Sequence, residues 1–430
     1  MRTIFDYCRR GTWALAALAL VLLAAERKAP FRVSLSVSPF AELVLGQGIR
    51  FTDGKRSAAT VEDLERLLVA HGATEVYARI NTSRSKVRGF GDHTLSKGLE
   101  RARLARKLAL NFNPELGLWR DYGDVRCQPS PDFSDFPEIK LPGGPWTSLT
   151  LDQMLPALRA YGAMAAREIL ATGAKVNVWD IGNEVDFGVA GVAPPPLPHG
   201  CDDTNGSNWY KAPDGIDPEI GKTSELSLLQ RPEAGRIAWL KQHVWPREAR
   251  MLAAVAAGVR SADRNARFST HLSGVASVLP DTAVAFYETM RQGGFLPDEL
   301  GFSFYPTGSD KPPRRLEAFK NTVAAVSKAL DRPVFVAEFG YPAARMTEGA
   351  FKDWNHAVEN YPQTPDGQAA FYRDFVKWAA AAGVTGVRPW APDLPMPGWG
   401  PFAFFSLDGK TAVARPVLDA LAGGLAGRAR

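Results

Sequence analysis

The feature that most constrains the fold is a regular alternation of short apolar segments with longer helical segments beyond residue 40. Such alternation is typical of a parallel sheet covered by helices. It is repeated eight times in one direction, which favours a closed (β/α)8 barrel, an α/β fold, over an open doubly wound sheet. Strands are predicted over 43–51, 75–80, 107–113, 175–183, 267–272, 299–305, 333–339 and 384–390, and helices over 60–71, 94–106, 151–172, 231–262, 280–292, 312–330, 366–382 and 413–422.

The composition excludes several classes of protein. The 430 residues are 45% hydrophobic and 23% charged, as in ordinary globular proteins. A net charge of +5, spread evenly, is too weak to indicate a nucleic-acid partner. No phosphate-loop or dinucleotide motif follows a strand, and the six histidines form no HExxH motif. We therefore expect no cofactor and no catalytic metal. We also expect the protein to be a monomer.

The N-terminus has the pattern of a targeting segment. Three arginines precede an unbroken apolar run over 13–25, which is shorter than the roughly 20 residues that span a bilayer. This predicts a secretory signal or an uncleaved anchor, with the membrane contacted only through 13–25. The rest of the chain is then expected outside the cytoplasm: secreted, periplasmic or membrane-anchored. The predicted organisation is a signal or anchor over 1–25, a linker over 26–42 and a barrel domain over 43–424.

Long loops follow strands three, four and eight of the predicted barrel, over 114–149, 186–230 and 391–412. They lie at the carboxyl ends of the strands, where barrel enzymes build their active sites. Aromatic side chains in these loops are either walls of a binding site or anchors that hold the loops in place. The tryptophans in question are Trp119, Trp146, Trp209 and Trp399.

Two of the same loops carry Cys127 and Cys201. In an oxidising compartment the two thiols could form a disulfide, and the alternative is two unrelated free thiols. The second loop is also acidic, which suits either a structural calcium ion or a solvated polar loop, although its spacing matches no EF-hand. The acidic and amide residues concerned are Asp202, Asp203, Asn205, Asp214 and Asp217.

Two glutamates at two strand ends carry the chemistry. Glu184 follows VWDIGN on the fourth strand, and Glu338 interrupts the apolar segment RPVFVA on the seventh. A buried acid at the end of an apolar strand is costly unless it is paired or used. Two opposed carboxyl groups suit glycoside hydrolysis, in which one protonates the leaving oxygen and the other attacks the anomeric carbon or activates water. The alternative for each glutamate alone is a salt bridge at the barrel rim.

The stretches VYARINTS, VWDIGNE, STHLSG, FSFYP, VAEFGYP and VRPWAP, on strands two and four to eight, resemble the retaining glycoside hydrolases with (β/α)8 barrels. Within that clan the chain most resembles family 53, the endo-β-1,4-galactanases that act on arabinogalactan. The likeness extends from about residue 44 to residue 420 and leaves out the large loops. It implies an enzyme with a polysaccharide or oligosaccharide substrate.

The resemblance also implies roles for individual residues. Glu184 is expected to be the acid/base and Glu338 the nucleophile. Asn183 is expected to hydrogen-bond the sugar hydroxyl next to the anomeric carbon. Further contacts with the substrate or with Glu338 are expected from Arg79, Tyr305, Trp390, His271 and Asn113. Of these, Arg79 and Tyr305 hold the Glu338 carboxylate and Trp390 forms the sugar platform, whereas a buried core histidine is an equal alternative for His271.

The chain departs from the family pattern at two places. Strand three reads LALNFNPELG, with Asn113 where the family has a histidine-containing stretch, and strand eight ends in Trp390-Ala391-Pro392 rather than Trp-Glu-Pro. A β-glucan, a mannan or a bacterial exopolysaccharide therefore suits these residues as well as galactan does. Two further functions stay open: a transglycosylase of exopolysaccharide metabolism and a non-catalytic polysaccharide-binding barrel.

Overall fold

The structure is a computed structural model that describes residues 30–88, 91–125, 127–196, 216–308 and 314–426. The chain divides into two units, Met1–Phe31 and Arg32–Arg430, and every helix and strand described below belongs to the second. The segment predicted as a signal or anchor lies outside the described residues. Within the described part of the chain, no helix is both long and apolar enough to cross a membrane.

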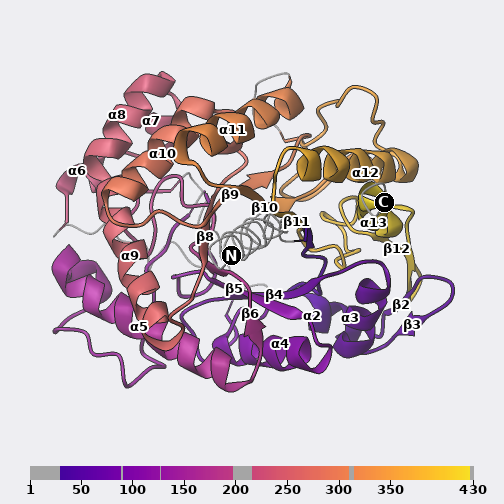
Figure 1. Cartoon of the computed structure of the whole chain (residues 1–430), viewed down its shortest axis with the longest axis horizontal. Coiled ribbons are helices and arrows are strands. Elements are labelled where there is room, and N and C mark those ends of the chain that lie inside the picture. The colour runs from indigo at the N-terminus through magenta and orange to yellow at the C-terminus, as the bar shows by residue number, and fades with distance from the viewer. Residues whose placement is uncertain (1–29, 89–90, 126, 197–215, 309–313, 427–430) are drawn as a thin grey trace, which may run out of the picture. The chain divides into compact units, whose positions relative to one another are not determined.

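The predicted (β/α)8 barrel is confirmed. All strand pairs of its sheet are parallel, in the order β1-β11-β10-β9-β8-β7-β5-β4, and β6 also pairs with β5. The backbone N–H of Thr74, just before β4, donates to the carbonyl of Val33 in β1 at 2.9 Å, so the two ends of this order meet. Figure 1 shows the strands at the centre of a ring of helices. The strands are β1 Arg32–Val33, β4 Glu75–Ile80, β5 Asn111–Leu116, β6 Lys175–Val176, β7 Trp179–Ile181, β8 Phe268–Leu272, β9 Glu299–Phe304, β10 Val334–Phe339 and β11 Gly386–Pro389.

The helices begin where the sequence supplies caps. The side chains of Thr60, Thr94 and Thr364 each accept a hydrogen bond from a backbone N–H in the first turn, which satisfies a donor that the helix leaves open. The main outer helices are α3 Val61–Ala70, α4 Leu95–Lys107, α5 Leu151–Ala171, α9 Trp245–Ala262, α10 Pro280–Gln292, α11 Arg315–Leu330, α12 Pro365–Ala381 and α13 Val417–Leu425. Shorter helices are α2 Ala41–Gly46, α6 Pro218–Lys222, α7 Glu225–Leu229 and α8 Glu233–His243.

The prediction of the first strand is wrong. Residues 43–51 contain helix α2 and the start of β2, whereas the first barrel strand is β1, inside the predicted linker 26–42. The serines that alternate with Val33, Leu35 and Val37 make this segment look like a polar linker. They are nevertheless buried, and Ser36 Oγ and the Val37 N–H both donate to the α3 carboxylate Glu65 at 3.0 Å. The barrel domain therefore begins at residue 32 rather than 43.

Three other boundaries differ from the predictions. The third strand begins at Asn111 rather than at 107, because α4 continues to Lys107. The predicted helix over 231–262 is broken at Val244, just before the Trp245-Pro246 start of α9, since proline suits the first turn of a new helix. The predicted helix over 413–422 is displaced toward the C-terminus, because its first residues belong to a strand.

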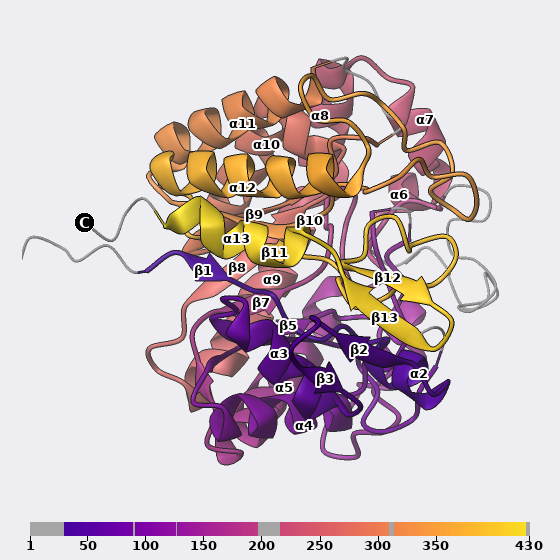
Figure 2. The same ribbon diagram turned by 90° about the vertical axis from the view of Figure 1, so that its right-hand side faces the viewer.

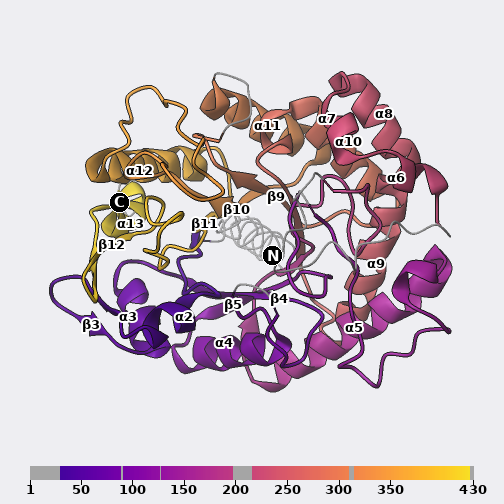
Figure 3. The ribbon, with the colours of Figure 1, turned by 180° about the vertical axis from the view of Figure 1, so that it is seen from behind.

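A second, four-stranded sheet in the order β12-β13-β2-β3 accounts for that strand and for part of the predicted loop 391–412. Its members are β12 Phe405–Asp408, β13 Thr411–Ala414, β2 Arg50–Thr52 and β3 Ser57–Ala58. The rings of Phe51 and Phe405 meet edge to face across it, with centroids 5.0 Å apart. Figures 2 and 3 show how it joins the two ends of this unit, beside α2, α3 and α13.

Candidate active site

Glu184 is placed by a sharp turn at the end of β7. The backbone is left-handed at Gly182 (φ 80°) and at Glu184 itself (φ 49°). A Cβ at Gly182 would lie 2.6 Å from a methyl carbon of Val185, so this position needs glycine. A non-glycine residue in this conformation is strained, and such strain is typical of functional sites. The carboxyl group of Glu184 consequently faces a cleft beyond the strand ends.

Glu338 lies in β10 and is held by two donors from other strands. Tyr305, directly after β9, donates its hydroxyl to Glu338 Oε2 at 2.8 Å, and Arg79 in β4 donates from Nη2 to Oε1. All three residues are at most 5% exposed. The structure thus brings Glu338, Tyr305 and Arg79 together, as the sequence predicts. Charge-assisted hydrogen bonds of this kind favour an ionised carboxylate.

Glu184 lines a cleft that Glu338 adjoins through Tyr305. A cavity of about 290 Å³ is lined by Glu184 and by Tyr305, the residue that donates to Glu338. Its walls come from the loops after five strands and from α7, so they lie at the carboxyl ends of the barrel strands. The other lining residues are Asp124, Val125, Glu225, Leu229, Ser273, Gly274, Val275, Gly308, Arg315, Ala350 and Trp354.

The electrostatic surroundings of the two glutamates differ. Burial, followed by the charge of Glu338, raises the pKa of Glu184 well above its ordinary value of 4.5. The backbone N–H of Val125 donates to its Oε2 at 3.3 Å. Glu338 instead forms an ion pair with the fully buried guanidinium of Arg79. The surroundings of Glu184 therefore favour its protonated form, while the charge of Glu338 is compensated by a cation.

Two aromatic side chains flank Arg79. Its guanidinium lies 4.1 Å from the ring centroid of Trp390, the predicted sugar platform, which is half-buried at the end of β11. On its other side, Arg79 Nη1 donates to the hydroxyl of Tyr122 at 3.3 Å. The sequence analysis missed Tyr122 as a site residue, because it lies in the long loop after β5, where no periodicity indicates which way a side chain points.

Asn183 is buried and forms hydrogen bonds with other residues of the protein. Its amide nitrogen donates to the carbonyl of Gly123 at 2.7 Å, and its backbone carbonyl accepts from Gln128 at 2.6 Å. Asn183 Oδ1 has no partner among the described residues. The structure thus ties Asn183 to the loop after β5, next to Glu184, with its side-chain oxygen buried.

Asn113 and His271 lie in the barrel interior with the arginines rather than with the two glutamates. Asn113 donates to the carbonyl of Val178 at 2.8 Å and accepts from Arg388, so both ends of its side chain are used. His271 is 1% exposed, and burial lowers its pKa well below 6.5, helped by the charges of Arg79 and Arg388. The structure does not bring Asn113 to the cleft.

Three of the four candidate tryptophans anchor loops. Trp119, Trp146 and Trp399 are each at most 7% exposed. The indole N–H of Trp146 donates to Ala190 O at 2.7 Å, and that of Trp399 to Ala391 O at 3.0 Å. Trp209 lies outside the described residues. The cleft wall instead includes Trp354, from the loop after β10.

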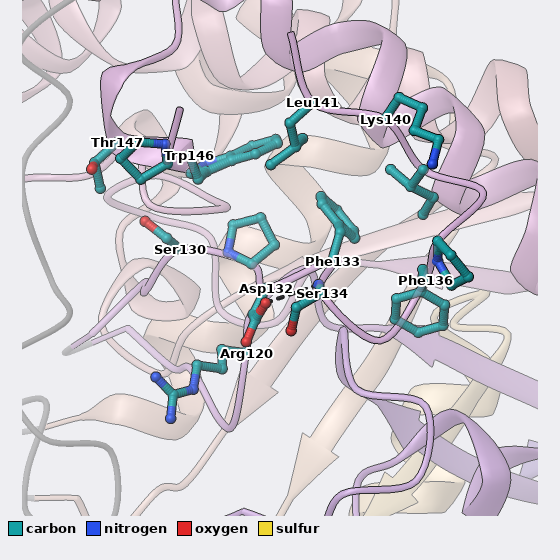
Figure 4. Close-up of a pocket in the computed structure, with 14 residues that line it drawn as sticks. Arg120, Ser130, Asp132, Phe133, Ser134, Phe136, Lys140, Leu141, Trp146 and Thr147 are labelled. Carbon is teal, nitrogen blue, oxygen red and sulfur yellow. Dashed lines mark hydrogen bonds between the residues drawn. The ribbon is translucent and has the colours of Figure 1, made fainter. Parts of the chain in front are cut away.

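A second pocket, of about 490 Å³, lies within the loop after β5. Figure 4 shows Phe133, Trp146 and Leu141 around it, with Asp132 accepting from the backbone N–H of Ser134. Phe133 packs against Trp146, with centroids 5.6 Å apart, and against Tyr161 of α5 at 5.5 Å. This aromatic cluster therefore forms a small core that fixes the loop to α5.

Cys127 is disulfide-bonded, whereas Cys201 lies outside the described residues. Asp202, Asp203, Asn205 and Asp214, from the candidate calcium loop, also lie outside them. The remaining member, Asp217, caps α6 and forms ion pairs with His243 and Arg247 at 3.0 and 2.9 Å. In the part of the chain that the structure describes, no three His, Cys, Asp or Glu side chains are grouped to hold a metal ion.

Comparisons of sequence agree with this geometry. Residues 214–400 match the family model of glycosyl hydrolase family 53, and this part contains Glu338 and Tyr305 but not Glu184. No curated protein matches the chain in sequence. The match confirms the resemblance to family 53 over this part of the chain and supports a glycoside hydrolase.

Solved structures share the barrel. The GH53 catalytic domain of Ignisphaera aggregans superposes with a TM-score of 0.64 at 17% identity, covering 93% of this chain and 98% of that one. A fungal β-1,4-galactanase structure gives 0.64 at 16% identity, with coverages of 91% and 99%. A xylanase A variant of P fluorescens subsp. cellulosa in complex with xylopentaose gives 0.51 at 13%, with coverages of 93% and 99%. At these identities the superpositions establish the fold.

Proposed function

We propose that this family 53-like barrel is a retaining endo-acting glycoside hydrolase that cleaves a β-linked polysaccharide by double displacement. The observation that carries the proposal is the contrast between the surroundings of two buried carboxyl groups that are close enough to interact. Glu338 accepts hydrogen bonds from Arg79 and Tyr305, as a nucleophilic carboxylate requires. Glu184 is buried with a raised pKa, as a general acid requires.

In the first step, one Glu338 oxygen attacks the anomeric carbon and forms a glycosyl ester. The bond from that carbon to the leaving oxygen breaks, and Glu184 gives its proton to the leaving oxygen. Tyr305 and Arg79 keep the attacking carboxylate in place during the step. Placing the reacting groups in advance lowers the entropic cost of reaching the transition state.

In the second step, Glu184, now ionised, takes a proton from a water molecule. The resulting hydroxide attacks the anomeric carbon from the face that the leaving group vacated, and the ester bond to Glu338 breaks. Glu338 is again a carboxylate and Glu184 again an acid, so protons and charges balance over the cycle. Two inversions give net retention of the anomeric configuration.

β-1,4-Galactan is the first substrate to test, because the two structures with the highest TM-scores cited above are described as a GH53 domain and β-1,4-galactanases. The experiment is a panel of galactan, β-glucan, mannan and exopolysaccharide substrates, with ¹H NMR of the first-formed product. The proposal expects cleavage of one of them with a β-configured product. An initially α-configured product would contradict double displacement, and elongated products in the presence of a sugar acceptor would indicate transglycosylation.

We further propose that the enzyme works outside the cytoplasm. Two observations support this: the basic and apolar segment before residue 26, and the disulfide at Cys127, which persists in oxidising compartments. Fusion of residues 1–42 to a reporter that is active only after export tests the proposal. A fusion protein that is produced in full length but shows no reporter activity would contradict it.

A further inference from the structure

A row of alternating charges crosses the barrel interior behind the nucleophile. It runs from Asp180 in β7 through Arg388 in β11, Glu115 in β5 and Arg79 in β4 to Glu338 in β10. Each member is an acid or a base with a neighbour of opposite charge, and none is more than 5% exposed. Isolated charges at this depth would be very unfavourable, so the members depend on one another.

Glu115 stands at the centre of this row. Its Oε1 forms an ion pair with Arg79 Nε at 2.6 Å. Its Oε2 accepts from the hydroxyl of Tyr77 at 2.8 Å and from Arg388 Nη1 at 3.3 Å. The side chain is fully buried, and Glu115 is not among the residues that line the cleft. Glu115 therefore acts only on other side chains of the protein.

Arg79 is a shared cation. The edge that carries Nε faces Glu115, and Nη2 on the same rigid plane donates to Glu338. Because the guanidinium is planar, an acceptor fixed on one edge also fixes the direction of the donors on the other. The face of the guanidinium is already set by the Trp390 ring, 4.1 Å away. The remaining freedom is rotation within that plane. Glu115 restrains it directly through the ion pair with Nε and also through Tyr77, whose hydroxyl accepts from Nε at 3.1 Å and donates to Glu115 at 2.8 Å.

We propose that Glu115 is a positioning residue for the nucleophile: by holding the Nε edge of Arg79, it sets where Arg79 Nη2 meets the Glu338 carboxylate. This inference rests on the proposed function and adds to it a residue that does not touch the substrate. The sequence offers the signal in hindsight, because Glu115 is two residues beyond Asn113 and shares its inward face.

The test uses two variants of Glu115 that differ in the number of side-chain oxygens left to accept hydrogen bonds. Glu115→Gln keeps one oxygen for Arg79, and Glu115→Met, of similar size, keeps none. The proposal expects kcat on the best substrate of the panel to fall by about a hundredfold in the Met variant and by about tenfold in the Gln variant, with KM changed by less than about threefold. Partial rescue by the conservative variant distinguishes positioning from a loss of packing.

The matched control is Glu75, an equally buried carboxylate at the start of the neighbouring strand β4. Glu75 lies 3.5 Å from Arg32, far along β4 from Arg79, and it does not contact the site. Glu75→Gln and Glu75→Met are expected to lower thermal stability comparably while kcat stays within twofold. Equal losses of kcat in both series would overturn the proposal, as would wild-type kcat in a folded Glu115 variant.

A second measurement does not depend on activity. Crystal structures of wild type and of Glu115→Gln, or of Glu115→Met where it folds, are expected to differ in the direction of Arg79 Nη2 relative to the Glu338 carboxylate. If the wild type cleaves no polysaccharide, the proposed function fails, and these structures still decide the positioning role. An unmoved Arg79 in both variants overturns it.

Discussion

At the scale of single residues, Glu338 is the most direct test of the site. Glu338→Gln removes the attacking charge but keeps the shape and an acceptor for Tyr305. We expect turnover to fall by about four orders of magnitude or more, with the fold and the binding of oligosaccharide retained. Kinetics, circular dichroism and calorimetric titration measure the three properties. Near-wild-type hydrolysis would contradict the assignment of the nucleophile.

The raised pKa of Glu184 predicts the alkaline side of the pH profile. The acid must be protonated, so activity persists well above pH 4.5 and is lost as pH rises through the raised pKa. In Glu184→Gln this alkaline limb disappears. Polysaccharide cleavage slows by roughly 10²–10⁴-fold, while aryl glycosides with good leaving groups are affected much less, because they need no proton. An unchanged alkaline limb in this variant would exclude Glu184 as the acid.

The sequence identifies residues that interrupt a pattern better than residues that continue one. Glu338 stands out as the one acid in an apolar strand, and Glu184 follows a glycine at a strand end. Asn113 follows the strand pattern, which predicts its inward face but not its depth. Inward side chains of a barrel are stacked in layers, and the layer depends on the register with neighbouring strands. Asn113 consequently lies below the site, bonded to Arg388.

At the scale of elements, the junction of α3 with the chain after β1 predicts a dependence of stability on pH. Glu65 is fully buried, and burial raises its pKa to about 7, against the hydrogen bonds from Val37 and Ser36. Protonation therefore stabilises the folded state fully below pH 4.5, and this contribution is lost as pH rises toward 7. Glu65→Gln lacks this titrating group. Between pH 4.5 and pH 7 its unfolding free energy is therefore expected to fall by up to about 3 kcal/mol less than that of the wild type.

Urea denaturation at pH 4.5 and pH 7 measures this difference. The matched control is Glu62→Gln on the exposed side of the same helix, where Lys107 and Arg66 lower the pKa of the carboxyl group. This control is expected to keep the wild-type dependence between the two pH values. If the unfolding free energies of the wild type and of Glu65→Gln change equally between pH 4.5 and pH 7, the role of Glu65 is refuted.

The starts of helices were predictable where a capping residue marks them. The position of a strand was not predictable where contacts with distant parts of the chain determine it. Thr60 and Thr94 cap α3 and α4 at the first residues of the predicted helices 60–71 and 94–106. The alternating serines of residues 34–38 carry no hydrophobic signal of a strand, and only Glu65 and the neighbouring strands explain why that segment is buried. A polar segment of this kind becomes a strand through its partners rather than through its own propensity.

At the scale of the whole barrel, β1 is expected to be indispensable. A chain that starts at residue 39 lacks the strand that pairs with β11 and accepts from Thr74, and it therefore leaves two sheet edges open. We expect this chain to aggregate or to unfold at a much lower temperature than a chain that starts at residue 30. Calorimetry and gel filtration compare the two. Equal melting temperatures would show that the barrel does not need β1.

The fold of the whole chain was the most predictable property, because eight strand and helix units in one direction allow few arrangements. The second sheet was not predictable, since β2 and β13 are about 360 residues apart and neither shows the periodicity of a barrel strand. Its strands are only two to four residues long, which is too short for a sequence pattern to develop.

The pairing of β1 with β11 also sets the order of events during biogenesis. The N–H of Arg32 donates to the carbonyl of Thr385, so the closing seam joins partners that a ribosome makes far apart in time. Until the last strand has left the ribosome, the nascent cylinder has an open side, and contacts of such sequence separation form slowly. For the export proposed above, such a delay would keep the polypeptide unfolded enough to pass through a translocation channel.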